Sequence, residues 1–241
     1  MSRYYYDLHI HSCLSPCGDD DMTPANIAGM ASLKGLTLLA LTDHNSCRNC
    51  PAFFEACNAF GIVPVAGMEL TTAEDIHLIV LFPTLEQAMA FDAEIHPRIL
   101  PIRNRPEIFG NQWIVDSDDN LLETEETLLI NATDLDIDGA IALVDRYGGV
   151  LYPAHIDRPS NGMIAVLGSV PKEYGFSCVE FNDLDQRDEI LAEQGLDCIT
   201  LCSSDAHELG KINEAEHFLD LEDEPYSSAL VRTRLIEFLK R

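Results

Sequence analysis

Short apolar runs rich in β-branched residues alternate along the chain with longer segments whose apolar positions recur at helical spacing. Such alternation is typical of βα units, in which each strand is followed by a helix that packs on the sheet. The expected strands are residues 4–10, 36–42, 62–67, 77–82, 150–154, 178–182 and 198–202. The expected helices are residues 24–34, 51–61, 85–95, 135–147 and 227–240. The pattern therefore predicts an α/β protein with a parallel sheet.

The pattern breaks in an irregular excursion at about residues 96–131, where prolines and a polar run leave room for a hairpin. The seven strands around it predict a distorted seven-stranded (β/α)7 TIM-like barrel. An open doubly wound sheet is the alternative, although the chain lacks the glycine-rich phosphate loop of that architecture. Because 241 residues with 46% hydrophobic composition suffice for one core, residues 1–241 are expected to form a single domain.

Six of the eight histidines lie at boundaries of the expected strands, beside acidic residues. In a parallel barrel, the carboxyl ends of the strands meet at one mouth, where active sites form. One histidine at a strand end is usually only solvated or hydrogen-bonded, but six of them indicate a shared site. His77 alone precedes its apolar run, so a tight hairpin after Glu69 is expected to return it to the mouth.

Two spacings indicate metal chemistry. His9 and His11 are two residues apart on a strand, so both imidazoles share one face and can bind one cation. Asp205 and His207 repeat this spacing with a carboxylate. Imidazoles combined with carboxylates suit zinc, iron(II) or manganese better than calcium.

These residues closely resemble the PHP family, named for its polymerase and histidinol phosphatase members. The matching elements occur in family order: DLHIHS at 7–12, TDHN at 42–45, GME at 67–69, HL at 77–78, PAH at 153–155 and SDAH at 204–207. The resemblance implies a distorted seven-stranded barrel around a trinuclear centre, a metal-dependent phosphoesterase activity, and two to three divalent metal ions (Zn, Fe or Mn) as cofactors.

The resemblance also implies the metal ligands. The first metal would be bound by His9, His11, Glu69 and Asp205. Glu69 would bridge to a second metal, completed by His77 and His155. The third would be held by His44 and His207 with a ligand from the loop after the first strand, where Asp19 is favoured over Asp20. Asp43 is expected to fix the tautomer of an imidazole by a hydrogen bond.

The expected reaction is hydrolysis of a small phosphomonoester or nucleotide by attack of a metal-bridging hydroxide on phosphorus. Glu69, Asp205 and His207 are the expected catalytic residues. Arg158 and Lys211 are expected to bind the substrate phosphate, because each follows a candidate ligand by three or four residues. Ordinary surface bases are the alternative for these two residues.

The net charge of −26 comes from 41 acidic and 15 basic residues. Such a surface repels phosphate backbones, so a small phosphorylated substrate is expected and extended nucleic acid is not. No window is apolar enough for a membrane span, and the N-terminus lacks the features of a signal peptide. These observations favour a cytoplasmic protein without a membrane partner, and they leave the oligomeric state open.

Cys13, Cys17, Cys47 and Cys50 fall in the loops after the first two strands. Four thiolates at these spacings could form a structural zinc or iron–sulfur site. Free thiols are the favoured interpretation in a cytosolic chain of this size.

Two other function classes stay open. An amidohydrolase-like metallohydrolase also begins with His-x-His on a barrel strand, but it usually ends its barrel with a lone aspartate. Its bridging ligand is often a modified lysine, and this chain has no lysine between Lys34 and Lys172. A non-catalytic metal-binding module is the other class, and loss of some ligands would be expected in it.

Overall fold

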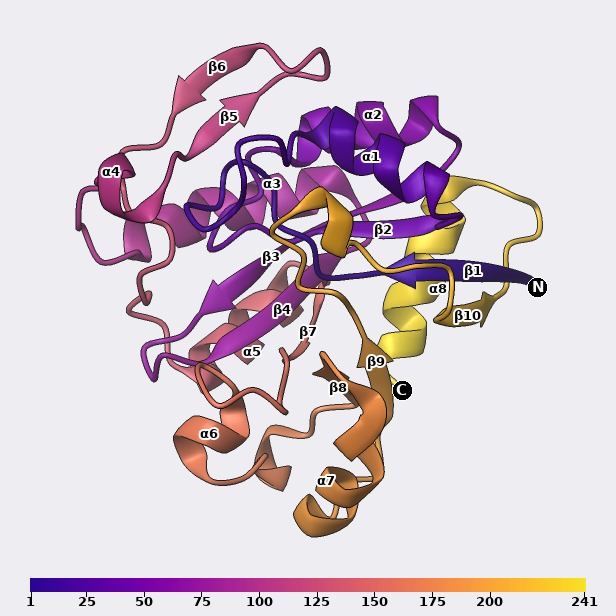
Figure 1. Ribbon diagram of the computed structural model, residues 1–241. Coiled ribbons are helices and arrows are strands. Elements are labelled where there is room, and N and C mark those ends of the chain that lie inside the picture. Colours follow the sequence, from indigo (N-terminus) through magenta and orange to yellow (C-terminus); the bar gives the residue numbers. More distant parts are fainter.

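The computed structural model describes all 241 residues and shows an α/β fold around a curled six-stranded sheet (Figure 1). The strand order is β10-β1-β2-β3-β4-β7. These strands are β1 (Ser2–Asp7), β2 (Leu38–Leu41), β3 (Val63–Thr71), β4 (His77–Phe82), β7 (Val150–Pro153) and β10 (Phe218–Leu221). A separate parallel pair is formed by β8 (Cys178–Phe181) and β9 (Ile199–Cys202).

The sequence pattern predicts a parallel sheet, but the sheet in the structure is mixed. Strands β1, β2 and β3 run parallel, but β4 is antiparallel to both β3 and β7. The reason is that the link from Thr71 to His77 is too short for a crossover helix, so β3 and β4 form a hairpin. This hairpin confirms the expected return of His77 to the end of β3, where it pairs with Thr71.

A closed seven-stranded barrel is not confirmed. All seven expected strands are present, but their hydrogen bonds divide them between the six-stranded sheet and the β8–β9 pair. An isolated parallel bridge between Ile10 and Ala206 connects the segment after β1 to the segment after β9. Strand β10 was not predicted, and it pairs antiparallel with β1 at the edge of the sheet. The fold is therefore a curled half-barrel.

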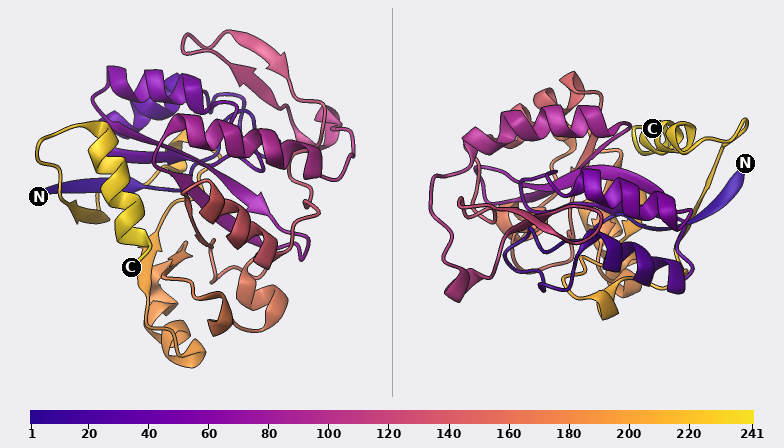
Figure 2. Two further views of the ribbon diagram at one scale, coloured as in Figure 1. Left: turned by 180° about the vertical axis from the view of Figure 1, so that it is seen from behind. Right: turned by 90° about the horizontal axis from the view of Figure 1, so that it is seen from above.

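The five expected helices are present. They are α1 (Pro24–Leu33), α2 (Cys50–Ala59), α3 (Leu85–Ile95), α5 (Ile137–Arg146) and α8 (Ser228–Leu239). The view from behind shows α3, α5 and α8 covering one face of the sheet (Figure 2). Helices α1 and α2 pack on each other, and α2 also packs on β3. None of the helices combines the length and the apolar character needed to cross a membrane.

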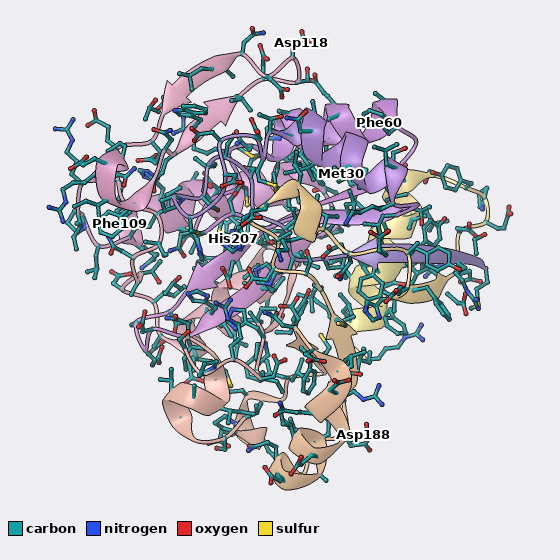
Figure 3. All side chains as sticks on the ribbon, viewed as in Figure 1. Met30, Phe60, Phe109, Asp118, Asp188 and His207 are labelled. Atoms are coloured by element: carbon teal, nitrogen blue, oxygen red, sulfur yellow. The ribbon has the colours of Figure 1, made fainter.

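The core consists of apolar clusters around the strands, and β3 is buried along all nine of its residues. Short helices α6 (Met163–Leu167) and α7 (Arg187–Gln194) accompany the β8–β9 pair in the lower part of Figure 1. The stick view places Asp188 of α7 at that end and His207 near the middle of the molecule (Figure 3). The carboxyl ends of β1 and β3 and the segment after β9 thus meet around His207.

The excursion contains α4 (Pro106–Phe109) and the hairpin of β5 (Trp113–Val115) and β6 (Leu121–Thr124). The expected hairpin is therefore confirmed. The excursion is fixed to the loops that follow β1 and β2. The backbone N–H of Trp113 donates to the carbonyl of Cys13, and the Asn45 amide donates to the carbonyls of Leu129 and Asn131. The excursion thus borders the end of the sheet at which the histidines gather.

Candidate metal centre

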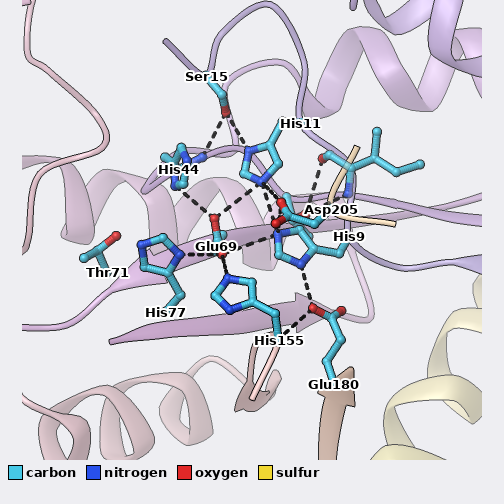
Figure 4. A network of polar contacts seen from close by, with 12 residues as sticks. His9, His11, Ser15, His44, Glu69, Thr71, His77, His155, Glu180 and Asp205 are labelled. Atoms are coloured by element: carbon cyan, nitrogen blue, oxygen red, sulfur yellow. Dashed lines mark hydrogen bonds and ion pairs between the residues drawn. The ribbon is translucent and has the colours of Figure 1, made fainter. Parts of the chain in front are cut away.

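Four side chains from three separate parts of the chain bring their donor atoms to one point (Figure 4). The Nε2 atoms of His9 and His11 are 3.1 Å apart. Asp205 Oδ1 lies 3.3 Å from His9 Nε2 and 3.2 Å from His11 Nε2. The Glu69 carboxylate lies 3.4 Å from each of the two nitrogens. His9, His11 and Glu69 are buried, and the side chain of Asp205 is 5% exposed.

These separations fit a metal ion. Ligand atoms at about 2.0–2.1 Å from a tetrahedral ion lie about 3.3 Å from one another. Five of the distances among these donor atoms, with Glu69 Oε1 next to His9 and Glu69 Oε2 next to His11, span 3.1–3.4 Å. Asp205 Oδ1 is buried and its nearest partners are the Nε2 atoms of His9 and His11, so its negative charge is costly unless a proton or a metal cation compensates it. The donor set of two imidazoles and two carboxylates suits zinc, iron or manganese.

Glu69 extends the centre on its other side. Its Oε1 is 2.7 Å from His77 Nδ1 and 3.0 Å from His155 Nε2, and its Oε2 is 2.9 Å from His44 Nδ1. His44, Glu69 and His77 form a second group of potential ligand atoms. Glu69 therefore lies between two sets of imidazoles, which is the position that a bridging carboxylate requires. His155 also contacts the Glu69 carboxylate, but it is not a member of the group formed by His44, Glu69 and His77.

A third group consists of His11, His44 and His207. The His11 and His207 rings stack with their centroids 4.2 Å apart. Asp19 belongs to none of these groups, and its hydrogen bonds are made by its backbone: the N–H donates to the carbonyl of His207 and the carbonyl accepts from the N–H of Met22. The carboxylate of the alternative, Asp20, accepts hydrogen bonds from Asn111. A ligand role for Asp19 stays a prediction.

Both imidazoles of the His-x-His pair are held in orientation by contacts to their Nδ1 atoms, on the side away from the centre. Nδ1 of His9 is 2.7 Å from Glu180 Oε1. Nδ1 of His11 is 2.9 Å from Ser15 Oγ, and that hydroxyl donates to Asp43 Oδ1 at 2.7 Å. The expected role of Asp43 thus corresponds to an indirect contact, because Ser15 stands between it and the imidazole. With each Nδ1 engaged, each Nε2 faces the centre.

Sequence reasoning missed Ser15 and Glu180. A signal for Glu180 existed, because a glutamate inside the apolar run 178–181 is unusual for a buried strand. Ser15 carried no signal, because serines are common in loops. Its role depends on how the loop after β1 folds back under His11.

Mutual charge shifts the pKa values in the centre. Burial raises the pKa of Glu69, but the imidazoles of His77 and His9 lower it well below its usual range. Burial lowers the pKa of His11, but hydrogen bonds to Asp205 and Glu69 raise it to about 9. The carboxylates are therefore anionic at neutral pH. A divalent cation would replace the protons that now balance their charge.

Two candidate ligands have unusual backbone conformations. His155 has φ +28° and Asp205 has φ +51°, in a region that residues other than glycine rarely adopt. Such conformations persist where the surrounding structure holds them, and they concentrate at functional sites. His155 follows the end of β7 by two residues and Asp205 follows the end of β9 by three, and both side chains contact other candidate ligands.

The two predicted phosphate-binding residues differ in position. The guanidinium of Arg158 contacts the Asp205 carboxylate directly, so Arg158 lies at the centre. Lys211 lines a hollow of about 360 Å³ beside Asp205 and His207. The other residues lining this hollow are Asn182, Ser204, Glu208 and Asn213, so no hydrophobic side chain lines it. Their binding of phosphate stays a prediction.

The four loop cysteines do not form a site of their own. Cys13 is buried against Trp113 and Asn49, whereas Cys47 and Cys50 direct their thiols to the carbonyl of Gly67. None of the groups of potential metal ligands contains a cysteine. None of the eight cysteines is in a disulfide bond.

Comparison with known proteins gives a match to the PHP domain over residues 7–204. A 5'-3' exoribonuclease of Haemophilus influenzae is 28% identical over 156 residues, which cover 64% of this chain and 49% of that protein. The chain thus spans about half the length of the curated relatives it matches. A candidate metal-dependent phosphoesterase of Bifidobacterium adolescentis is 20% identical with a TM-score of 0.61, covering 96% of this chain and 94% of that one.

The lesion-specific endonuclease Q of Pyrococcus furiosus has the same fold, with a TM-score of 0.71 and 20% identity over 99% of this chain and 56% of that one. A further endonuclease Q structure holds a 27-mer duplex with an abasic lesion at the active site, with a TM-score of 0.67, 20% identity and coverage of 96% and 56%. These structures contradict the exclusion of extended nucleic acid. That inference was wrong because net charge averages the whole surface, whereas binding depends on the potential at the site.

Proposed function

The chain belongs to the PHP domain family, and on that premise we propose that it is a metal-dependent phosphoesterase that hydrolyses phosphoester bonds in nucleic acid. The observation that carries this proposal is the convergence of His9, His11, Glu69 and Asp205 on one point at ligand-to-ligand distances. Without a metal cation, the buried Asp205 Oδ1 would have two imidazole nitrogens as its nearest partners, at 3.2–3.3 Å.

The chain supplies the ligands and the surroundings of the reaction. The nine proposed metal ligands are His9, His11, Asp19, His44, Glu69, His77, His155, Asp205 and His207. Divalent ions, when bound, would polarise the phosphoryl group and increase the acidity of water at the site. Glu69 lies where it can hold two such ions at a fixed separation, because imidazoles contact both of its oxygens.

Cationic side chains would hold the substrate. Arg158 contacts Asp205, so its guanidinium lies within one side-chain length of the centre and can bind phosphate oxygens in a forked geometry. Lys211 lies across the polar hollow and has no ion-pair partner within 4 Å. The Nδ1–H of His207 donates to the backbone carbonyl of Asp205 at 2.8 Å, which leaves Nε2 available at the mouth.

The comparisons support nucleic acid as the substrate class. The curated relative with the longer alignment is an exoribonuclease, and endonuclease Q acts on a damaged duplex with the same fold. A small phosphomonoester or a mononucleotide is the second candidate. The hollow beside Asp205 and His207 favours it, since about 360 Å³ with a wholly polar lining is suitable for one phosphorylated sugar.

The test is purification without chelator, elemental analysis of bound metal, and assay on a substrate panel. The panel contains 5'-phosphorylated RNA and DNA oligonucleotides, a duplex with an abasic site, and mononucleotides. We expect two to three equivalents of Zn, Fe or Mn and cleavage of an oligonucleotide. His9→Ala and Asp205→Ala should each lower activity by roughly 100-fold or more.

His217→Ala is the matched control, because this histidine contacts Tyr6 outside the centre and should keep full activity. Activity on mononucleotides alone would select the second candidate. Full metal loading without release of any product would show a binding module and refute the enzyme. Equal activity of His9→Ala and the unaltered protein would show that chemistry occurs elsewhere.

A further inference from the structure

Glu180 is a buried carboxylate that forms no ion pair with an arginine or lysine, and its one side-chain partner is the imidazole of His9. It lies in β8 between apolar neighbours and is 0% exposed. Its side chain makes two contacts, both through Oε1: His9 Nδ1 at 2.7 Å and the backbone N–H of His155 at 3.3 Å. Oε2 is buried and has no partner. Burial of an ionised carboxylate is costly, so packing alone does not explain a glutamate at this position.

The contact with His9 determines which ring nitrogen faces the centre. A carboxylate can only accept from the imidazole, so Nδ1 carries a proton and Nε2 is the nitrogen left to bind a cation. That Nε2 lies 3.1 Å from His11 Nε2 and 3.3 Å from Asp205 Oδ1. We propose that Glu180 is a positioning residue that fixes the tautomer and the orientation of His9 for metal binding, an inference that rests on the proposed metal centre.

The same oxygen also joins two parts of the fold at the centre. Through the N–H of His155 it holds the residue whose backbone has φ +28°. The backbone carbonyl of Glu180 accepts from the N–H of Ile156 at 2.9 Å. The β8–β9 pair, which shares no ladder with the six-stranded sheet, is thus connected to the segment after β7 that contains the candidate ligand His155. Glu180 therefore sets the relation of His9 to His155, whose rings stack with centroids 5.9 Å apart.

The experiment compares Glu180→Gln and Glu180→Leu with the unaltered protein. Glutamine keeps the volume and one acceptor but removes the charge, whereas leucine removes the acceptor. Zn²⁺ affinity is measured by competition with a chromophoric chelator. We expect a loss of about tenfold for Glu180→Gln and about 100-fold for Glu180→Leu, in the range found when partners of ligand imidazoles are removed.

A spectroscopic readout separates positioning from packing. In the Zn²⁺-loaded protein with ¹⁵N-labelled histidine, the Nδ1–H of His9 should give a slowly exchanging, downfield proton signal. The signal should shift in Glu180→Gln and vanish in Glu180→Leu. Cys178→Ala is the matched control, because Cys178 is buried two residues earlier on β8 in an apolar cluster. It should lower stability but keep both the affinity and the signal.

Unchanged Zn²⁺ affinity in Glu180→Gln, or a retained signal in Glu180→Leu, would overturn the proposal. If Glu180→Leu does not fold by circular dichroism, the glutamine variant decides. The outcome is independent of turnover: a protein that binds Zn²⁺ with the expected Glu180 effects but cleaves no phosphoester would refute the proposed function alone. A cleaving enzyme with unaffected Glu180 variants would refute this inference alone.

Discussion

Single side chains at the centre depend on a hydroxyl that the strand pattern does not reveal. Ser15 Oγ contacts His11 Nδ1 at 2.9 Å, donates to Asp43 at 2.7 Å and accepts from the backbone N–H of His44 at 3.2 Å. All of these groups are buried. This oxygen atom is thus the partner of His11 Nδ1 and of the His44 N–H, and it adds a third hydrogen bond to Asp43, which also accepts two from Ser12.

Ser15→Ala is therefore expected to be costly. Each buried group left without a partner costs about 1–3 kcal/mol, so the free energy of unfolding should fall measurably in urea titrations. Zn²⁺ affinity should fall by about 10–100-fold, because His11 loses its orienting partner. Ser203→Ala is the control, since Ser203 Oγ is buried without any partner and its removal should cost little. Equal effects of the two substitutions would contradict the proposed role of the Ser15 hydroxyl in orienting His11.

A second residue-scale prediction concerns pH. Burial raises the pKa of Asp92, whose Oδ1 accepts from Ser46 Oγ and the N–H of Cys47. An acid whose pKa is raised on folding binds protons more readily in the folded state, so its contribution to stability declines as pH rises above the unfolded value. Asp92→Asn keeps Oδ1 and both hydrogen bonds but does not ionise.

We therefore expect the unfolding free energy of Asp92→Asn, relative to the unaltered protein, to increase from pH 4 to pH 7. The measurement is urea unfolding of the metal-free protein at each pH. The mutant should gain least near pH 4, where Asp92 is closest to neutral in both states. A relative stability that falls with rising pH would show that Asp92 is more acidic in the fold than in the unfolded chain.

The sequence could indicate the candidate ligands because their spacing repeats on strands. His9 and His11 had to share a face, and the structure places their Nε2 atoms 3.1 Å apart. Glu180 and Ser15 could not be assigned in the same way, because their partners are more than a hundred residues away or in a folded-back loop. Their roles follow from tertiary contacts that no local pattern encodes.

At the scale of elements, the excursion is held against the centre by close backbone contact. Gly110 ends α4 with φ +99°, and a Cβ there would lie 2.0 Å from the carbonyl oxygen of Pro16. The loop containing Pro16 continues to Asp19, whose N–H donates to the carbonyl of His207. The position of α4 is therefore coupled to the mouth of the proposed metal site.

Gly110→Ala should thus both strain the backbone and separate the excursion from this loop. The strain alone costs about 1–3 kcal/mol, and the clash adds to it. Gly61→Ala is the matched control, because Gly61 has φ +71° with nothing within 4 Å of its Cβ position. We expect at least twice the loss of unfolding free energy in Gly110→Ala, measured in urea. Equal losses of unfolding free energy in the two variants would mean that the loop containing Pro16 moves away from residue 110 at no cost in stability.

Element order was predictable because helix caps and strand runs are local signals. Thr23 accepts from the N–H of Asn26 at the start of α1, and threonine followed by proline is a local signal for the start of a helix. The direction of the strands was harder to predict from the sequence. Only the short link before His77 indicated that β4 runs antiparallel to β3. Strand β10 was not predicted because its residues 218–221 lie partly exposed at the edge of the sheet and do not form an uninterrupted apolar run.

The molecule as a whole carries a charge of −26, and this opposes the approach of any polyanion. The opposition acts over the Debye length, which is about 30 Å at 10 mM salt and about 8 Å at 150 mM. Local cations at the mouth, Arg158 and Lys211, and the proposed metal ions act over shorter distances. Repulsion of a nucleic-acid strand therefore comes from the whole protein surface, and attraction comes from the proposed metal site and the cations beside it.

Because salt screens distant charges more than contacts, the two contributions separate in a salt titration. With metal saturating, kcat/KM for a 20-nucleotide strand should rise between 10 and 150 mM salt, by roughly two- to tenfold. A mononucleotide has few charges to repel and should respond less, which makes it the internal control. Proteins that neutralise many phosphates show the opposite sign, because salt competes with counterion release. A steep fall of kcat/KM with salt for the strand would therefore reveal an extended cationic face and contradict recognition confined to the metal centre.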